Sequence, residues 1–301
     1  MSALSDSGAR TWFITGASRG LGRAFTRAAL ERGDRVVAVA RTIDAVDFDE
    51  SHGERLLPLA LDLTDRTAVF GAVTTSIEHF GQLDIIVNNA GALSLGMIEE
   101  FTEEQARAQF DVNFFGALWV CQAVLPHLRA RRAGHIVQIS SIAALGGFAS
   151  TGMYSASKFA LEGMSEALAS EAATFDVAVS IVQPGGYWTD LYRSMTTPTP
   201  MDAYDGLRTQ LEAQWADGSV DSEPRLAAEA LLELVDSDEP PLRLLLGGTA
   251  YDLAFDISRR RMDTWAGWEQ VSRAAEHAVS AHSDPIETTD TLTENFQTTT
   301  K

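Results

Sequence analysis

The chain contains 301 residues, of which 45% are hydrophobic and 22% are charged, a composition typical of globular rather than disordered proteins. Its 42 acidic and 23 basic residues give a net charge of −19, which disfavours nucleic acid and anionic membranes as partners. A single cysteine, Cys121, excludes an internal disulfide and a cysteine-rich metal site.

Hydrophobic runs alternate with helical patterns along the chain. We predict strands at residues 11–15, 35–40, 56–63, 83–87, 135–139, 177–182 and 242–246. We predict helices at 66–80, 103–132 and 154–174, and another from the glycine-rich segment 16–22 to Gly33. Most strands are continuous apolar runs, as in parallel sheets covered on both faces. The predicted fold class is therefore α/β: a single-domain, Rossmann-like, doubly wound parallel sheet of seven strands, with ligands at the strands' carboxyl ends.

The ends of the chain differ in composition from its centre. We predict a flexible arm over residues 1–10, a catalytic domain over 11–283 and a disordered, threonine-rich tail over 284–301. Residues 186–222 break the alternation of strand and helix, and we interpret them as a lid over the substrate. No run of about 18 apolar residues and no signal-peptide pattern is present, so we expect a cytoplasmic protein without a membrane span. The six histidines lack ligand spacing, so we expect no metal.

A glycine-rich turn follows the first strand. Gly16, Gly20 and Gly22 open a helix, whose free N–H groups and partial positive charge can bind a pyrophosphate. A turn of this kind alone also fits an ordinary tight connection. Two arginines make the prediction more specific. Arg19 lies inside the turn. Arg41 stands just after the second strand, where a protein that binds NAD would have an acidic residue to bind the ribose hydroxyls. A guanidinium suits a 2′-phosphate, so the pair favours NADP(H).

Asp62 follows the third strand. Its carboxylate would accept a hydrogen bond from adenine, or it would cap the loop. The sequence leaves both roles open.

Tyr154 and Lys158 are four residues apart and share one helix face. A nearby ammonium lowers a phenol's pKa and makes tyrosine useful as an acid–base group. Lys158 is the only lysine besides Lys301, which argues against chance pairing. Ser141, with Ser140 as its rival, follows the fifth strand, where a hydroxyl can hold a substrate carbonyl.

Asn113 lies within the predicted helix 103–132, although asparagine is a mediocre helix former. It would bend the helix or bind a water near Lys158.

Together these segments resemble the short-chain dehydrogenase/reductase family. The resemblance rests on TGASRGLG at 15–22, NNAG at 88–91, Asn113, Ser141, YSASK at 154–158 and Pro184-Gly185, and it covers about residues 10–190, or 250 with the seventh strand. It implies Tyr154 as general acid–base, Lys158 as the group that lowers its pKa and holds the nicotinamide ribose, Ser141 as the carbonyl-orienting group and Asn113 as the holder of a relay water. The implied cofactor contacts are Gly16, Ser18, Arg19, Gly20, Leu21, Gly22, Arg41, Asp62, Leu63, Asn89, Ala90, Gly91, Tyr154, Lys158, Pro184, Gly185 and Thr189.

The expected function is NADPH-dependent hydride transfer to a small-molecule ketone, or from a secondary alcohol. Large side chains in and near the lid predict a bulky, apolar substrate in contact with Phe148, Met153, Tyr187, Trp188, Leu191, Tyr192 and Met195. The same side chains would also serve simply to pack the lid. The alternatives are an epimerase or dehydratase with the same site, and a nucleotide-binding regulatory protein. A homodimer or homotetramer through the long helices is also compatible with the sequence.

Overall fold

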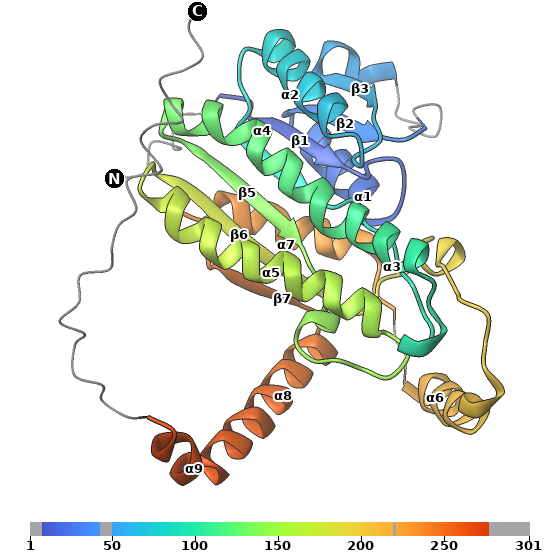
Figure 1. The fold of residues 1–301 in the computed structure, drawn as a ribbon. Helices are drawn as coiled ribbons and strands as arrows, with labels where there is room; N and C mark the ends of the chain where they lie inside the picture. The colour runs from blue at the N-terminus through green and yellow to red at the C-terminus, as the bar shows by residue number, and fades with distance from the viewer. Residues whose placement is uncertain (1–7, 43–49, 219–220, 277–301) are drawn as a thin grey trace, which may run out of the picture. The chain divides into compact units, whose positions relative to one another are not determined.

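The computed structural model describes residues 8–42, 50–218 and 221–276, and the chain divides into two compact units, 1–257 and 258–301. The first unit contains a seven-stranded parallel sheet in the order β3-β2-β1-β4-β5-β6-β7 (Figure 1). The strands are β1 (Thr11–Thr15), β2 (Arg35–Ala40), β3 (Leu56–Ala60), β4 (Ile85–Asn88), β5 (Gly134–Ile139), β6 (Val177–Pro184) and β7 (Arg243–Leu246). The predicted α/β fold with a seven-stranded parallel sheet is confirmed. The domain limits at 10 and 283 stay predictions, and the tail 284–301 lies outside the described residues.

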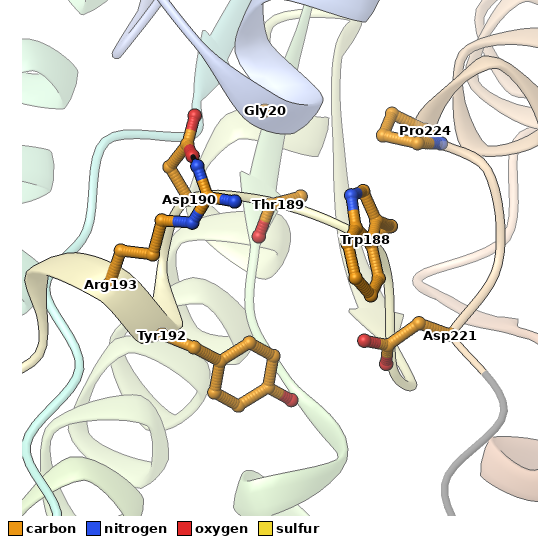
Figure 2. A pocket seen from close by; sticks show the side chains of 8 residues that line it. All are labelled: Gly20, Trp188, Thr189, Asp190, Tyr192, Arg193, Asp221 and Pro224. Atoms are coloured by element: carbon orange, nitrogen blue, oxygen red, sulfur yellow. Dashed lines mark hydrogen bonds and ion pairs between the residues drawn. The ribbon is translucent and has the colours of Figure 1, made fainter.

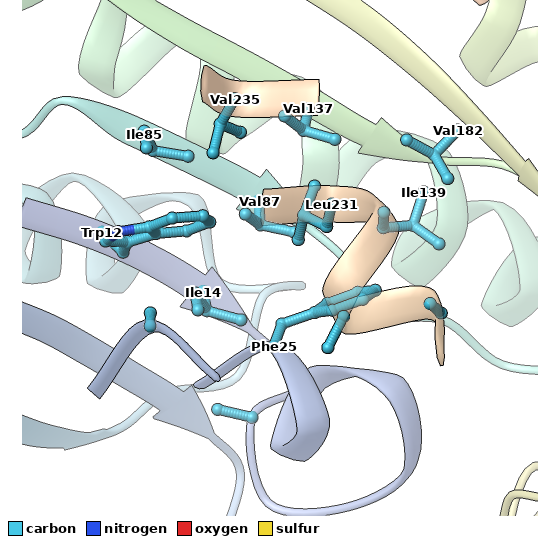
Figure 3. Packing of buried hydrophobic residues seen from close by; sticks show 14 of the residues in the cluster. Trp12, Ile14, Phe25, Ile85, Val87, Val137, Ile139, Val182, Leu231 and Val235 are labelled. Atoms are coloured by element: carbon cyan, nitrogen blue, oxygen red, sulfur yellow. The ribbon is translucent and has the colours of Figure 1, made fainter. Parts of the chain in front are cut away.

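Helices cover both faces of the sheet. The helices of the first unit are α1 (Gly20–Glu31), α2 (Arg66–Phe80), α3 (Glu103–Phe110), α4 (Gly116–Arg131), α5 (Gly152–Ala173), α6 (Asp205–Gly218) and α7 (Pro224–Asp236). On one face, α1 and α7 supply Phe25, Leu231 and Val235 to a core that includes Trp12 and Ile14 of β1 (Figure 3). On the other face, α2, α4 and α5 pack against a second buried cluster. The central strands are thus buried on both sides, as their apolar sequences require, whereas the edge strands β3 and β7 are partly exposed.

The boundaries of α2 follow from its end residues. The Asp65 side chain accepts a hydrogen bond from the Ala68 N–H at 3.0 Å and so caps the helix. Gly81, at φ 80°, ends it in the left-handed conformation. Both signals are local, and the predicted helix 66–80 is confirmed.

Two predicted elements differ most from the structure. The third strand ends at Ala60 instead of residue 63, and Asp62 accepts hydrogen bonds from the backbone and hydroxyl of Thr64 in a turn. The predicted helix 103–132 is interrupted by a π-helical turn at Asp111–Phe115, between α3 and α4. Such turns change which side chains face a neighbouring element, and this one contains Asn113.

Beyond β7 the chain forms α8 (Gly248–Gly267) and α9 (Glu269–Ala274), which the sequence analysis did not predict. In the second unit, Met262, Trp265, Trp268 and Val271 are exposed. Within the described residues, none of the helices is long and apolar enough to cross a membrane.

Candidate functional site

The glycine turn brings the chain close to the end of β4. Gly16 and Gly20 have φ values of 67° and 54°, which glycine adopts without strain. A Cβ on Gly22 would lie 2.2 Å from the Gly16 carbonyl oxygen, so this position has no room for any side chain. Arg19 precedes α1 without giving it a side-chain cap, which leaves the first N–H groups of the helix available to an anion. The turn therefore has the shape and polarity of a phosphate cradle.

Asn89 fastens this turn to the sheet. Its Nδ2 donates to the carbonyl oxygens of Thr15 at 2.9 Å and of Gly16 at 3.3 Å. The Thr15 hydroxyl in turn accepts from the N–H groups of Asn89 and Ala90, both at 3.0 Å. Sequence reasoning gave Thr15 no role of its own, although it begins the TGASRGLG segment. In the structure it orders the turn, and Asn89 acts on the turn's backbone.

Three residues were predicted at the adenosine end of the cofactor. Asp62 caps the loop through Thr64, and those bonds, together with the nearby Arg41 guanidinium, lower the pKa of its carboxyl. Arg41 is exposed at the end of β2, so its guanidinium is accessible to a ligand. Arg19 donates from Nη2 to the Ser194 hydroxyl at 2.8 Å and so joins the glycine turn to the segment after β6.

Tyr154 and Ser141 meet beside the carboxyl end of β5. Tyr154 is 9% exposed, and its burial raises the pKa of the phenol to about 12. A hydrogen bond with the Ser141 side chain acts in the opposite direction, and nearby Tyr192 adds to the rise. The predicted lowering of this pKa by Lys158 was wrong, because in this structure the cost of burying a phenolate is the larger effect. Tyr154 is therefore protonated at neutral pH and can donate a proton.

Ser140 and Ser141 point to different partners. Ser141 Oγ accepts from the Ala143 N–H at 3.1 Å, and this side chain also bonds Tyr154. Ser140 is 3% exposed and donates to Glu162 Oε1 at 2.5 Å. The geometry favours Ser141 over Ser140 as the hydroxyl that faces a substrate.

Lys158 and Asn113 flank Gly91. Lys158 is 4% exposed, its Nζ donates to the Ile139 carbonyl at 2.8 Å, and it lies 5.9 Å from the centroid of the Tyr154 ring. Burial lowers the pKa of Lys158 to about 8. A Cβ on Gly91 would lie 3.6 Å from Lys158 Nζ and 3.4 Å from Asn113 Oδ1, so both polar atoms approach the same point.

Backbone and side-chain bonds fix the Asn113 carboxamide. Its Oδ1 accepts from the Ala92 N–H at 2.8 Å, and its Nδ2 donates to the Ala92 carbonyl and to Ser157 Oγ, both at 3.0 Å. The π-helical turn thus presents Asn113 to the chain that follows β4. Its role as the holder of a water stays a prediction.

A cavity of about 330 Å³ opens between the glycine turn and the segment after β6 (Figure 2). Its lining includes the predicted residues Trp188, Thr189 and Tyr192. Thr189 lies against the turn, since a Cβ on Gly20 would approach its side chain to 3.2 Å. The remaining lining residues are Gly20, Asp190, Arg193, Asp221 and Pro224.

The other predicted substrate residues separate into three groups. Leu191 packs on an apolar cluster of Leu93, Ala143 and Tyr154, which places it beside the candidate acid. Tyr187 is 8% exposed and belongs to the hydrophobic core, so it does not line the cavity. Phe148 and Met195 are exposed, and Met153 is partly buried on α5.

The segment after β6 is latched to the chain that follows β4. The Leu95 N–H donates to the Thr196 carbonyl at 3.0 Å. Glu100 Oε1 accepts from the Met201 N–H at 2.8 Å and from Arg208 Nη1 at 2.6 Å. The bond from Met201, followed by the one from Arg208, lowers the pKa of Glu100 to about 2, below its ordinary 4.5. A carboxyl with a depressed pKa favours the folded state above its ordinary pKa and loses this contribution as pH falls toward 2, so the latch is intact at neutral pH.

We expect Glu100→Gln to loosen the latch, because it removes the charge that holds Met201 and Arg208. KM for the substrate should rise several-fold while kcat stays within about twofold of its wild-type value. Steady-state kinetics and limited proteolysis within residues 196–218 measure the effect. Glu103→Gln, which removes an exposed carboxylate paired with Arg107, is the control. A wild-type KM and proteolysis rate in Glu100→Gln would contradict the latch.

The glycine turn is the candidate site for the phosphates of a cofactor. Among the described residues, no group of three or more His, Cys, Asp or Glu side chains is arranged to hold a metal ion. The cradle of Gly16, Gly20 and Gly22 admits a phosphate where any Cβ on Gly22 would clash. The glycine turn therefore fits the pyrophosphate of a dinucleotide.

Known proteins are similar to this chain in sequence and in architecture. The family model of the short chain dehydrogenases matches residues 10–199. The 3-ketodihydrosphingosine reductase of Bacteroides thetaiotaomicron is 36% identical over 238 residues, which are 78% of this chain and 86% of the relative. The crystal structure of a short-chain dehydrogenase from Streptomyces avermitilis is 35% identical, with a TM-score of 0.83 over 90% of this chain and 100% of that one.

A short chain dehydrogenase from Burkholderia cenocepacia, solved in complex with NADP, is 27% identical, with a TM-score of 0.70 over 86% of this chain and 96% of that one. The matched residues 10–199 include both the glycine turn and the pair Tyr154–Lys158. This chain belongs to the short-chain dehydrogenase family of oxidoreductases.

Proposed function

We propose that the protein is an NADP(H)-dependent oxidoreductase that interconverts a ketone and a secondary alcohol. The observation that carries the proposal is the buried Tyr154, hydrogen-bonded to Ser141 and adjacent to Lys158 at the carboxyl end of the sheet. A related reductase named for a keto compound and a family member solved with NADP support the reaction and the cofactor.

The chain's own residues divide the work as follows. A reduced nicotinamide dinucleotide, with its phosphates at the glycine turn and its ribose at Lys158, would supply hydride to the carbonyl carbon. Ser141 orients the carbonyl oxygen, and Tyr154 donates its proton to that oxygen as negative charge develops there. Lys158 stabilises the phenolate left behind, since a buried anion needs a nearby cation. Because the pKa of Tyr154 is raised, the phenol holds its proton at neutral pH and gives it up only as negative charge develops on the carbonyl oxygen.

The surroundings of Tyr154 favour an apolar substrate. Leu93 and Ala143 form a cluster with Tyr154, and Leu95 and Leu191 pack against it. Trp188 and Tyr192, both exposed by half or more, extend this surface into the cavity. We therefore propose a bulky, apolar ketone in preference to a phosphorylated sugar.

The decisive experiment is a test of NADPH oxidation, with NADH in parallel, over aryl, aliphatic, steroidal and sugar ketones. Turnover of apolar ketones with NADPH preferred, and an alcohol identified as product, is the expected result. Equal activity on sugars would contradict the apolar pocket. NADPH binding without turnover of any ketone would contradict the reaction.

Replacing Arg41 by aspartate should shift cofactor preference toward NADH. The change removes an exposed guanidinium at the end of β2 and puts there the acid that suits a free ribose. The ratio of kcat/KM for NADPH over NADH should fall by about tenfold or more, because charge-assisted bonds to a phosphate are strong. Arg107→Asp makes the same charge change on the exposed face of α3 and is the control. An unchanged ratio in Arg41→Asp would show that the 2′-phosphate binds elsewhere.

A further inference from the structure

Glu162 is a buried carboxylate on the helix that carries Tyr154 and Lys158. It is 7% exposed and lies four residues after Lys158 on α5, so the three side chains share one helix face. Removing a carboxylate from water is costly unless hydrogen bonds and opposite charges replace the lost hydration. The partners of Glu162 are therefore informative.

Those partners come from the ends of neighbouring strands. The Ser140 hydroxyl, which follows β5, donates to Oε1 at 2.5 Å. Gln183 Nε2, near the end of β6, donates to Oε1 and Oε2 at 2.9 and 3.1 Å. Arg243 Nη2, at the start of β7, lies 3.4 Å from Oε2. One carboxylate thus ties α5 to three strands of the sheet.

Two of the tied residues adjoin the candidate active site. Ser140 precedes Ser141, the hydroxyl that bonds Tyr154, and Gln183 precedes the predicted cofactor contacts Pro184 and Gly185. A displacement of either strand end would move these groups relative to Tyr154. Transfer of hydride and proton is sensitive to such shifts, since reacting atoms must be held within a fraction of an ångström.

Glu162 also places a negative charge near Lys158. Burial lowers the pKa of Lys158, and Glu162 acts in the opposite direction. The other ionisable groups around the pair are Tyr154 and Glu166 on α5 and Arg243 on β7, where Arg243 also pairs with Glu166. The negative charge of Glu162 therefore favours the charged form of Lys158 and offsets part of the effect of burial.

We propose that Glu162 is a positioning residue, which aligns Ser141 with the Tyr154–Lys158 pair and keeps Lys158 charged. It touches neither substrate nor cofactor and acts through Ser140, Gln183 and Lys158. The catalytic part of this inference rests on the proposed function, whereas the effect on the charge of Lys158 does not.

The charge of Lys158 can be measured directly, because the chain contains only two lysines. Labelling lysine with ¹³C at Cε gives two signals, from Lys158 and Lys301, and Lys301→Arg assigns them. In Glu162→Gln we expect the titration midpoint of Lys158 to fall by about one unit, because the favourable opposite charge is gone. Glu162→Asp keeps the charge and should leave the midpoint near its wild-type value.

Kinetics test the alignment. In ketone reduction, Glu162→Gln should lower kcat about tenfold or more, on the usual scale for misplaced catalytic groups. The decline of kcat at high pH should move to lower pH, since Lys158 loses its proton more readily without the negative charge of Glu162. Glu162→Asp should lower kcat while leaving that decline in place. Glu166→Gln removes the neighbouring carboxylate, which is half-exposed, and is the control in both measurements.

The outcomes separate the two proposals. A wild-type midpoint and pH profile in Glu162→Gln, with only a lower melting temperature, would reduce Glu162 to a structural residue and leave the proposed reaction standing. A shifted midpoint in a protein that reduces no ketone with NADPH would support the role of Glu162 toward Lys158 and overturn the proposed reaction.

Discussion

Tyr154→Phe should lower kcat for ketone reduction by about 100-fold or more, the usual scale for losing a general acid. The substitution removes the phenolic proton and the hydrogen bond with Ser141 while it keeps the ring in its buried place. Because the ring still packs on Leu93 and Ala143, the fold and NADPH binding should be retained. Single-turnover absorbance of NADPH and fluorescence titration of the cofactor measure the two quantities.

Tyr251→Phe is the matched control, because it deletes a hydroxyl from an exposed tyrosine on α8. It should leave kcat and NADPH affinity unchanged. Near-normal kcat in Tyr154→Phe would remove Tyr154 from the chemistry and would direct attention to another proton donor. A loss of NADPH binding in the same variant would mean that the hydroxyl serves the cofactor more than the substrate.

Gly22→Ala should abolish cofactor binding and destabilise the first unit. The added Cβ would lie 2.2 Å from the Gly16 carbonyl oxygen and 2.4 Å from Asn89 Nδ2, so the backbone of the turn must move. Overpacking of this kind costs roughly 1–3 kcal/mol, which corresponds to a fall in melting temperature of several degrees for a protein of this size. Thermal unfolding and NADPH titration measure the two effects.

Gly71→Ala makes the same change in a helix where no neighbour lies within 4 Å of the new Cβ. It should raise stability by up to about 1 kcal/mol, since alanine favours helices over glycine, and leave NADPH affinity unchanged. If Gly22→Ala bound NADPH as tightly as the wild type, the glycine turn would not be the phosphate site. The close approach of Gly22 to Gly16 would then be only a packing requirement.

The latch of Glu100 and the tie made by Glu162 hold different parts of the site. Glu100 fastens Met201 and Arg208, in the segment after β6, to the chain after β4. Glu162 joins the ends of β5 and β6 to α5, and so governs the reacting groups. The two variants should accordingly differ: Glu100→Gln should change mainly KM, and Glu162→Gln should change mainly kcat.

Local chemistry explains where sequence reasoning succeeded. The limits of α2 follow from the Asp65 cap and from Gly81. The continuous apolar runs predicted both ends of β1 and β2 correctly. The glycine turn and the Tyr154–Lys158 pair were selected because their spacing has a direct physical meaning on a strand–helix turn and on a helix face. The seven-stranded parallel sheet followed from the order of these elements.

The sequence by itself determined the seven strands and their sheet, the helices α1, α2 and α5, and the residue types at the carboxyl edge, because these depend on periodicity and on neighbours along the chain. Only the tertiary structure decided the pKa of Tyr154, the π-helical turn at Asn113 and the place of Tyr187 in the core. It alone revealed the partners of Glu162, which are 21 or more residues away in sequence. Burial and long-range hydrogen bonds depend on how distant segments pack, and no local pattern of residues encodes them.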